Sequence, residues 1–407
     1  MKKVLLMNNT HVIGNRPNSY SNQLFYLCRM FKEYGYTIYN LVHVYDLNNG
    51  AEFTKLYSYT EFKQLLDETY VDKPEDELLK DIWFLSYQNK SLAVDTDHIN
   101  SIVDQNKIDI IFLLGDVHVV NARDLLDKTQ KTKRFNVPSF VWFPCHSYPC
   151  TEFDLNGLSA FNSIICLSPS IKLLLEKQFP DKAVTYLPHV IDRIYTSTSK
   201  GDLRDKWHLP KDKYIVLVIA NISTEDNNRK CIDTILTSFK QFKDKYVNTI
   251  LCIHATIVSY PLQDLMDALN ISSDDVFINN TVLSKDEIAE LYTLSDTYIC
   301  CSKTEGFGIP ILESQLYGTN VISSNFTSMA EHNFQKNVSD ISTVAHHYKG
   351  NGNWTLPSTY SLFNMLEQVY LNDNKTKVNR AQWITGELTS YKNVKEQLYR
   401  IIQNVPR

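Results

Sequence analysis

The sequence predicts an α/β protein built from two parallel-sheet domains. Short apolar runs alternate with helical patterns along its 407 residues, as in chains whose strands and helices alternate around a sheet. Several runs, among them "IDIIFLLG", "PSFVWFP" and "FNSIICLS", are continuously apolar, which suits strands buried on both faces. A polar segment, "RIYTSTSKGDL", separates two such alternations. The length suits roughly two to three domains of ordinary size.

The first alternation begins with the strand "KKVLLMN". The segment "SNQLFYLCRMFKEYG" then places an apolar stripe on one helical face and ends at Gly35. The strand "TIYNLVHV" follows, and residues 60–106 are polar and helical in parts. After the three apolar runs, "AVTYLPHVID" closes this half near Asp192. We therefore expect an N-terminal Rossmann-like domain over residues 1–192.

The second alternation contains the strands "KYIVLVIANIS", "NTILCIHATI", "DVFINNT", "TYICCS" and "NVISSN". Between them lie the helical segments "CIDTILTSFKQFKDKY" and "SKDEIAELYTLS", and two more helices, 375–388 and 391–405, close the chain. We expect a second Rossmann-like domain over residues 193–388 and a separate final helix over residues 389–407. Ligands of such sheets bind beyond the carboxyl ends of the strands, so a cleft between the domains is the expected site.

The composition excludes several classes of function. The net charge of −5 disfavours binding to nucleic acid or to an anionic membrane. No apolar run approaches the roughly 18 residues that a membrane span needs. The N-terminal "MKKVLLMNNTH" has too short an apolar stretch for a signal peptide and is interpreted as a strand.

Eight cysteines occur without a Cys-x-x-Cys pair, mostly inside apolar runs. We expect buried free thiols in a reducing, cytoplasmic compartment.

The stretch "SKTEGFGIPILESQLYG" combines a strand end near Ser302 with signals for a following helix. Pro310 suits the first helical position and Gly318 the position after the last, so the helix is predicted over residues 309–317. Its first N–H groups would be free to bind phosphate oxygens. These groups belong to Phe307, Gly308 and Ile309.

Two glycines and two glutamates surround this helix start. Gly306 and Gly308 would let a ligand approach the backbone closely. Glu305 lies before the helix and Glu313 one turn inside it, where both could hydrogen-bond a polyhydroxy ligand. The alternative is a capped helix whose carboxylates are simply favoured near its positive end.

Glu305 and Glu313, with "GFGIP" between them, resemble the E-x7-E motif of retaining GT-B glycosyltransferases of family four (glycosyl transferases group 1). "NRKCIDTILTSF" resembles the element that supplies an Arg/Lys pair to the donor diphosphate. The resemblance is specific over residues 221–325 and looser over the first 150. "YLPHVID" resembles the family's Pro-His-Gly-x-Asp element, with Pro188, His189, Asp192 and a valine, Val190, in the glycine position.

The resemblance implies roles for individual residues. Arg229 and Lys230 would contact the leaving diphosphate. Glu305 would bind hydroxyls of the transferred sugar, and Glu313 the ribose of the nucleotide. The N–H groups of residues 307–309 would hold the sugar and its phosphates.

The remaining implied site residues are less closely matched. His146, after the run "VWFP", would lie near the anomeric carbon, or it is a surface turn histidine. Asn221 stands where many family members have a Gly-Arg pair. Gly14 would line the cleft, although the family's Gly-Gly loop is absent there. Val282 and Leu283 would border the base.

The resemblance also implies a reaction. A hexose would pass from a nucleotide-diphosphate sugar to a glycan or other hydroxyl acceptor, with retention of configuration and without an essential metal or cofactor. GDP-mannose is the first donor to expect and UDP-glucose the second. The final helix would cross back onto the N-terminal domain.

Three other interpretations compete with this one. A dehydrogenase would need G-x-G-x-x-G after the first strand, and no such run exists. A metal-dependent GT-A enzyme could use Asp95 and Asp97, but Asp97 better suits the cap of a helix beginning at His98. A non-catalytic sugar-nucleotide or glycan-binding module remains open.

A basic cluster could bring the protein to an acidic membrane or acceptor, or could form a solvated helix end. It consists of Lys128, Lys131, Lys133 and Arg134.

Overall fold

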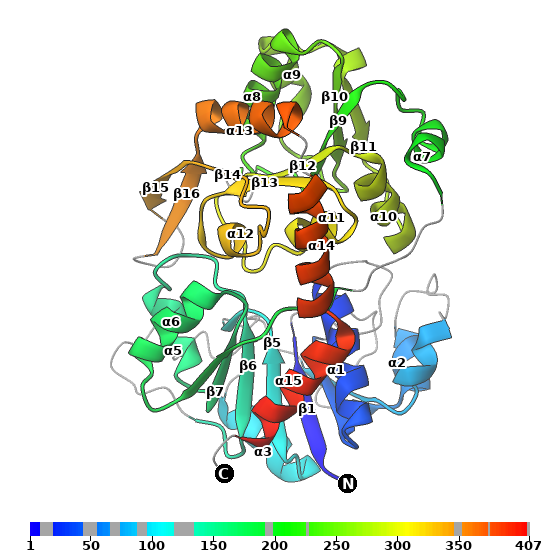
Figure 1. Ribbon diagram of the computed structural model, residues 1–407. Helices are drawn as coiled ribbons and strands as arrows, with labels where there is room; N and C mark the ends of the chain where they lie inside the picture. Colours follow the sequence, from blue (N-terminus) through cyan, green and yellow to red (C-terminus); the bar gives the residue numbers. More distant parts are fainter. Residues whose placement is uncertain are drawn as a thin grey trace.

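Two α/β domains lie one above the other in the computed structural model, each around its own sheet (Figure 1). The structure describes residues 1–8, 19–43, 55–65, 74–87, 96–117, 134–191, 198–224, 228–345, 352–372 and 375–404.

The N-terminal sheet has eight strands in the order β3-β4-β2-β1-β5-β6-β7-β8. All neighbours are parallel except β3, which pairs antiparallel with β4. The strands are β1 (Lys3–Met7), β2 (Thr37–His43), β3 (Leu56–Tyr57), β4 (Trp83–Tyr87), β5 (Ile110–Leu114), β6 (Ser139–Phe143), β7 (Ser163–Cys166) and β8 (Ala183–Tyr186). The helical elements are α1 (Ser19–Glu33), α2 (Tyr59–Leu65), the 3-10 helix η2 (Pro74–Leu79), α3 (Thr96–Asn106), α5 (Glu152–Leu158) and α6 (Pro169–Gln178).

The continuously apolar runs form central strands, as predicted. Val4 and Leu6 of β1 enter the core on one face of the sheet, and Leu5 and Met7 enter the core on the other. Both faces are therefore covered, which explains why these strands show no alternation of polar and apolar residues.

The C-terminal sheet has six parallel strands in the order β11-β10-β9-β12-β13-β14. They are β9 (Tyr214–Ile219), β10 (Thr249–His254), β11 (Val276–Asn279), β12 (Thr297–Cys300), β13 (Asn320–Ser324) and β14 (Val338–Ser339). The helical elements are α7 (Lys200–Lys206), α8 (Ile232–Lys245), α9 (Leu262–Ala268), the 3-10 helix η4 (Ser273–Asp275), α10 (Lys285–Leu294), α11 (Ile309–Leu316), α12 (Thr327–Glu331) and α13 (Thr359–Leu371). The predicted class, two parallel-sheet α/β domains, is confirmed.

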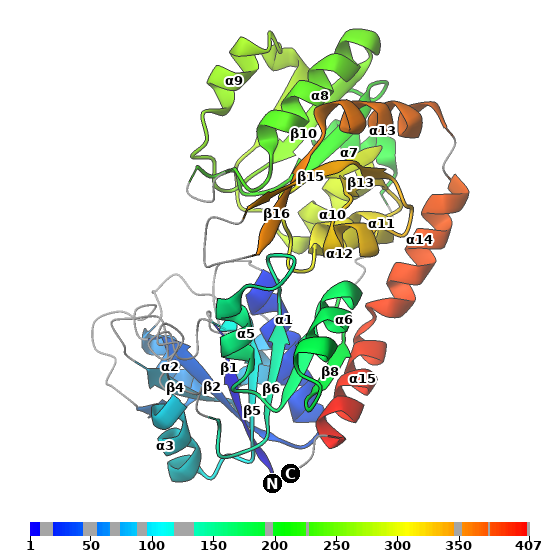
Figure 2. The same cartoon turned by 90° about the vertical axis from the view of Figure 1, so that its left-hand side faces the viewer.

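Three elements near the end of this domain were not predicted from the sequence. Strands β15 (Ile341–Ala345) and β16 (Asn353–Pro357) form a separate antiparallel pair, and α13 follows them. Figure 2 shows the β15–β16 pair at the side of the C-terminal domain, reaching down toward the N-terminal one.

The last two helices, α14 (Lys375–Leu388) and α15 (Tyr391–Gln403), descend from the upper domain to the lower one (Figures 1 and 2). The Gln382 side chain on α14 donates a hydrogen bond of 2.8 Å to the Leu316 carbonyl at the end of α11. On α15, Val394, Leu398 and Ile402 enter the same core as α1.

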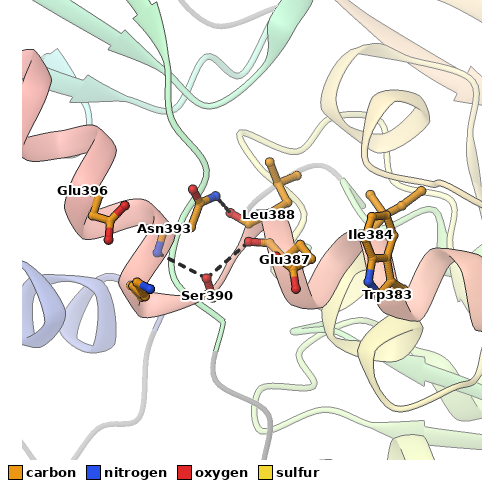
Figure 3. A pocket seen from close by; sticks show the side chains of 8 residues that line it. Trp383, Ile384, Glu387, Leu388, Ser390, Asn393 and Glu396 are labelled. Carbon is orange, nitrogen blue, oxygen red and sulfur yellow. Dashed lines mark hydrogen bonds between the residues drawn. The ribbon is translucent and has the colours of Figure 1, made fainter.

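A surface pocket lies where α14 meets α15. Trp383 and Ile384 line it from α14, and Asn393 and Glu396 from α15 (Figure 3). Of the predicted site residues that the structure describes, none lines this pocket.

The eight cysteines are buried and none forms a disulfide. Within the described part of the chain, no helix is long and apolar enough to cross a membrane.

The structure corrects one helix boundary. Helix α3 begins at Thr96 rather than at His98, so Asp97 lies in its first turn instead of capping it. Gly14, Asp95, Asp192 and the lysines of the basic cluster lie outside the described residues.

Candidate functional site

The predicted helix start after β12 is present. Helix α11 covers Ile309–Leu316, and Gly308 precedes it with a φ of 83°, a left-handed conformation that favours glycine. Pro310 lies in the first turn, and Gly318, with a φ of 82°, follows the last. Within the described residues, the N–H groups of residues 307–309 donate to no protein acceptor. They are therefore available to an anionic ligand.

Glu305 lies at the centre of a cluster of charged side chains. Its Oε1 accepts hydrogen bonds from Lys230 Nζ at 2.5 Å, from Arg229 Nη1 at 3.2 Å and from Ser302 Oγ at 2.7 Å. The Glu305 side chain is 14% exposed. The loop between β9 and α8 supplies both cations, and the loop after β12 supplies Glu305, so parallel neighbouring strands bring the predicted residues together.

The charge state of Glu305 follows from this environment. Burial by itself favours the neutral acid, but the positive charges of Lys230 and Arg229 hold the pKa of Glu305 at about 2. Glu305 is therefore a carboxylate at neutral pH and a hydrogen-bond acceptor, which does not suit it to donate a proton.

His146 faces this cluster from the N-terminal domain. It follows β6, and its Nε2 lies 3.3 Å from Asp116 Oδ1, just past the end of β5. Burial favours the neutral imidazole, but the hydrogen bond and the charge of Asp116 outweigh it and raise the pKa of His146 above its usual value. Asp116 was missed in the sequence analysis. It could have been found from its position, because it immediately follows the buried strand "IDIIFLLG".

Gly306 lies where the Glu305 loop meets the His146 loop. A Cβ atom built on it would lie 2.6 Å from Pro144 Cβ and 3.1 Å from His146 Cε1. The absence of a side chain at position 306 therefore lets the loop that carries Glu305 approach the loop that carries His146. The approach of a ligand to Gly306, which we predict from the sequence, stays a prediction.

The Phe307 side chain is buried in the core that α1 and α15 share. Its ring lies 4.8 Å from the His189 ring and 4.6 Å from the His332 ring, between centroids. His332 Nδ1 donates to the Phe307 carbonyl at 2.8 Å, which leaves its Nε2 to accept from the Tyr186 hydroxyl at 3.0 Å. Residues of both domains thus fix the backbone at the start of α11.

Glu313 has its partner on α10 rather than in the Glu305 cluster. The Tyr292 hydroxyl donates to Glu313 Oε2 at 2.9 Å. Burial raises the pKa of Glu313, and the hydrogen bond from Tyr292 offsets only part of that. Within the described residues, Glu313 thus has its hydrogen-bond partner on α10, whereas Glu305 has its partners in the loops before α8 and α11.

The predicted substrate-binding residue Asn221 follows β9, and the two residues predicted to border the base, Val282 and Leu283, follow β11. Asn221 Oδ1, after β9, accepts from Thr256 Oγ1 at 2.9 Å. Val282 is 66% exposed, whereas Leu283 is buried in the core of the C-terminal domain.

His254 and Asn279 were not predicted in this region. They end β10 and β11, and His254 Nδ1 lies 2.9 Å from Asn279 Oδ1.

Gly14, the last predicted site residue, is outside the described part of the chain. Among the residues that are described, no group of three or more His, Cys, Asp or Glu side chains is placed to hold a metal ion.

Part of the chain matches a known protein family. Residues 199–348, which carry Arg229, Lys230, Glu305 and Glu313, match the family described as "Glycosyl transferases group 1". No curated protein matches the chain by sequence.

Several solved structures have the same fold over the whole chain. Sucrose-phosphate synthase from Thermosynechococcus elongatus is 13% identical, with a TM-score of 0.69 over 99% of this chain and 98% of its own. A trehalose-6-phosphate structure from E. coli with bound UDP-2-fluoro glucose is 10% identical, with a TM-score of 0.62 over 99% of each chain. A trehalose-6-phosphate synthase studied for glycosyl transfer with retention is 10% identical, with a TM-score of 0.60 over 100% of each chain. By its fold and the match of residues 199–348 to the group 1 family, the chain is a glycosyltransferase of the GT-B type.

Proposed function

We propose that this protein is a retaining hexosyltransferase that moves a hexose from a nucleotide-diphosphate sugar to a glycan or other hydroxyl acceptor. The observation that carries the proposal is the cluster of Glu305 with Arg229 and Lys230. It lies in the loops before α8 and α11, and His146 faces it from the other domain.

The two cations suit the leaving group. During transfer, negative charge grows on the departing diphosphate while the sugar gains oxocarbenium character. Arg229 and Lys230 both reach one carboxylate oxygen of Glu305, so their charged groups converge on one place. We assign them, with the N–H groups at the start of α11, to the diphosphate. Preorganised donors of this kind are typically worth about 3–4 kcal/mol each in the transition state.

Glu305 would serve the sugar and the cations together. As a carboxylate of 14% exposure it can accept hydrogen bonds from sugar hydroxyls while it orients Lys230 and Arg229. His146, oriented by Asp116, would lie beside the reacting carbon. Glu313, on the α10 side of the helix, would take the nucleotide ribose.

Two donors are to be tested first. The sequence resemblance favours GDP-mannose. UDP-glucose gains support from the E. coli trehalose-6-phosphate structure, which holds UDP-2-fluoro glucose. Retention is supported by the resemblance and by the synthase studied for transfer with retention. We propose that no metal is essential, because the two cations supply the positive charge at the diphosphate.

We also propose that the protein works in the reducing cytoplasm. Cys145 Sγ and Cys150 Sγ lie 2.9 Å apart without a bond, and a reducing compartment keeps such a pair as thiols.

A second candidate is a catalytically weak module that binds nucleotide sugars or glycans. Such a module would keep the donor-binding residues, so a binding measurement cannot distinguish it from a hexosyltransferase. The release of nucleotide from the donor distinguishes the two.

The test combines binding with turnover. The purified chain is screened by thermal shift against GDP-mannose and UDP-glucose, because a ligand that binds only the folded state raises its midpoint. The donor that binds is then incubated with a hydroxyl acceptor and EDTA, and nucleotide release is followed. We expect stabilisation by one donor and release that EDTA does not abolish. Stabilisation without release would favour the binding module, and activity that returns only with manganese would refute metal independence.

A further inference from the structure

Strand β16 joins the two loops that form the candidate site. The Thr355 N–H donates to the carbonyl of Lys303 at 3.0 Å, two residues before Glu305. The Asn353 carbonyl accepts from the Tyr148 N–H at 3.1 Å, two residues after His146. One short strand thus binds the Glu305 loop of its own domain and the His146 loop of the other.

Trp354, between those two residues, reaches His146 itself. Its indole Nε1–H donates to the His146 carbonyl at 2.9 Å. The Thr304 hydroxyl donates to the same carbonyl at 2.9 Å. Both donors belong to the C-terminal domain, so the backbone of His146 is held from across the domain boundary.

The packing around this joint is tight. A Cβ atom at Gly352 would lie 2.6 Å from Ser147 Oγ, and one at Gly306 would lie 2.6 Å from Pro144 Cβ. The His146 loop is therefore enclosed between the β16 side and the Glu305 side. A small displacement of Trp354 would move the His146 carbonyl that its indole holds, and the backbone carries the imidazole with it.

We propose that Trp354 is a positioning residue, whose indole N–H sets the His146 loop so that the imidazole faces the Glu305 cluster in the catalytic arrangement. This inference rests on the proposed function, which places His146 at the reacting carbon. Strand β16 lies beyond residues 199–348, so the anchor is a feature that the family match does not cover.

The test is a double-mutant cycle between Trp354 and His146. Trp354→Phe removes the N–H donor and keeps an aromatic ring, and His146→Ala removes the imidazole. Trp383→Phe is the matched control, since Trp383 is 68% exposed on α14 and belongs to neither of the two loops. Initial rates are measured with the donor that the thermal-shift screen identifies, and the thermal midpoint is measured for every variant.

We expect Trp354→Phe to lower kcat about tenfold, because the His146 carbonyl keeps only one of its two donors and the imidazole is no longer held in place, with the donor KM changed less than about twofold. Trp383→Phe should match the wild type. In the His146→Ala background, Trp354→Phe should produce no further loss, because a residue that acts through His146 has nothing left to position.

The other outcomes contradict the inference. An unchanged kcat in Trp354→Phe would overturn it, and so would an equal loss in both backgrounds, since the residue would then act by another route. A loss of kcat that follows a fall in the thermal midpoint would indicate general destabilisation and would also overturn it. If the wild-type chain transfers no hexose from any donor, the proposed function itself fails, and this result is distinct from all the others.

Discussion

Glu305 balances two positive charges with one carboxylate. Its hydrogen bonds to Lys230, Arg229 and Ser302 hold it as an anion, with a pKa of about 2. The residue therefore orients the two cations as well as being available to sugar hydroxyls. A glutamine side chain in its place would keep the shape but neither the charge nor the full accepting capacity.

We predict that Glu305→Gln lowers kcat/KM about 100-fold or more, the scale of a lost preorganised electrostatic contact. The variant should stay folded by circular dichroism. Glu313→Gln is the matched control on the neighbouring helix, and it should mainly raise the donor KM because it is assigned to the ribose. Near-normal transfer by Glu305→Gln would remove Glu305 from the mechanism.

Lys230 is the second residue whose role can be isolated. Its Nζ lies 2.5 Å from Glu305 Oε1, and its side chain is 17% exposed. Lys230→Ala should weaken binding of the free nucleoside diphosphate about tenfold or more, because a charge-assisted contact is lost. Calorimetry measures this directly.

The control for Lys230→Ala is Lys240→Ala, further along the chain on α8, where the lysine pairs with Asp244 on the surface. It should bind the diphosphate like the wild type. Equal affinities for all three proteins would exclude Lys230 from the diphosphate site.

At the scale of elements, the start of α11 depends on two glycines for different reasons. Gly308 supplies a left-handed conformation, and Gly306 supplies space against Pro144 and His146. An alanine Cβ at position 306 would overlap Pro144, so Gly306→Ala should push the two loops apart. Overpacking of this kind lowers the free energy of unfolding by about 1–3 kcal/mol. We expect a loss of kcat together with a lower thermal midpoint.

Gly386→Ala on α14 is the control for that substitution. The nearest atom to its added Cβ is Leu316 Cδ1 at 3.7 Å, an ordinary contact. Alanine in a helix interior is favoured over glycine by about 1 kcal/mol, so this variant should be at least as stable as the wild type and fully active. A Gly306→Ala protein that behaves in the same way would refute the close approach of the two loops.

The sequence was informative where local signals agree. Pro310 and Gly318 predict the ends of α11 within a residue of those observed, and the apolar runs identify the buried strands. The sequence was uninformative where a residue is explained by contacts with the other domain. Gly306 is required by neighbours in the other domain, and Asp116 is recognised only beside His146. Strand β16 was missed because the two loops that it contacts are distant from it in sequence or belong to the other domain.

At the scale of the whole molecule, buried histidines link the domains. His332 bonds Phe307 of one domain and Tyr186 of the other, and the His189 ring lies against Phe307. Burial lowers the pKa of His332 to about 4, and burial and the nearby His332 lower the pKa of His189 to about 3. In the unfolded chain both titrate near about 6.5.

The unfolded state therefore binds more protons than the folded state between about pH 6.5 and pH 4. We predict that the free energy of unfolding is highest above about pH 6.5 and falls as the pH decreases through this window. Each histidine contributes a loss of about 2 kcal/mol at about pH 5. Urea unfolding at about pH 7 and about pH 5 measures the difference.

Between these two pH values, the free energy of unfolding should fall less in His332→Gln than in the wild type. The difference should be about the contribution of one histidine. His208→Asn, at an exposed position with a φ of 54°, should leave the loss unchanged. If His332→Gln loses as much stability as the wild type over this interval, then His332 is not held neutral between the domains.

The central claim is retaining transfer of a hexose at the Glu305 cluster, and the anomeric configuration of the first product tests it most directly. The wild-type chain is mixed with the donor it binds, an acceptor and EDTA, and the anomeric proton of the product is followed by NMR before it can equilibrate. We expect a product with the donor's configuration, formed by the wild type and far more slowly by Glu305→Gln. A product of inverted configuration would contradict it.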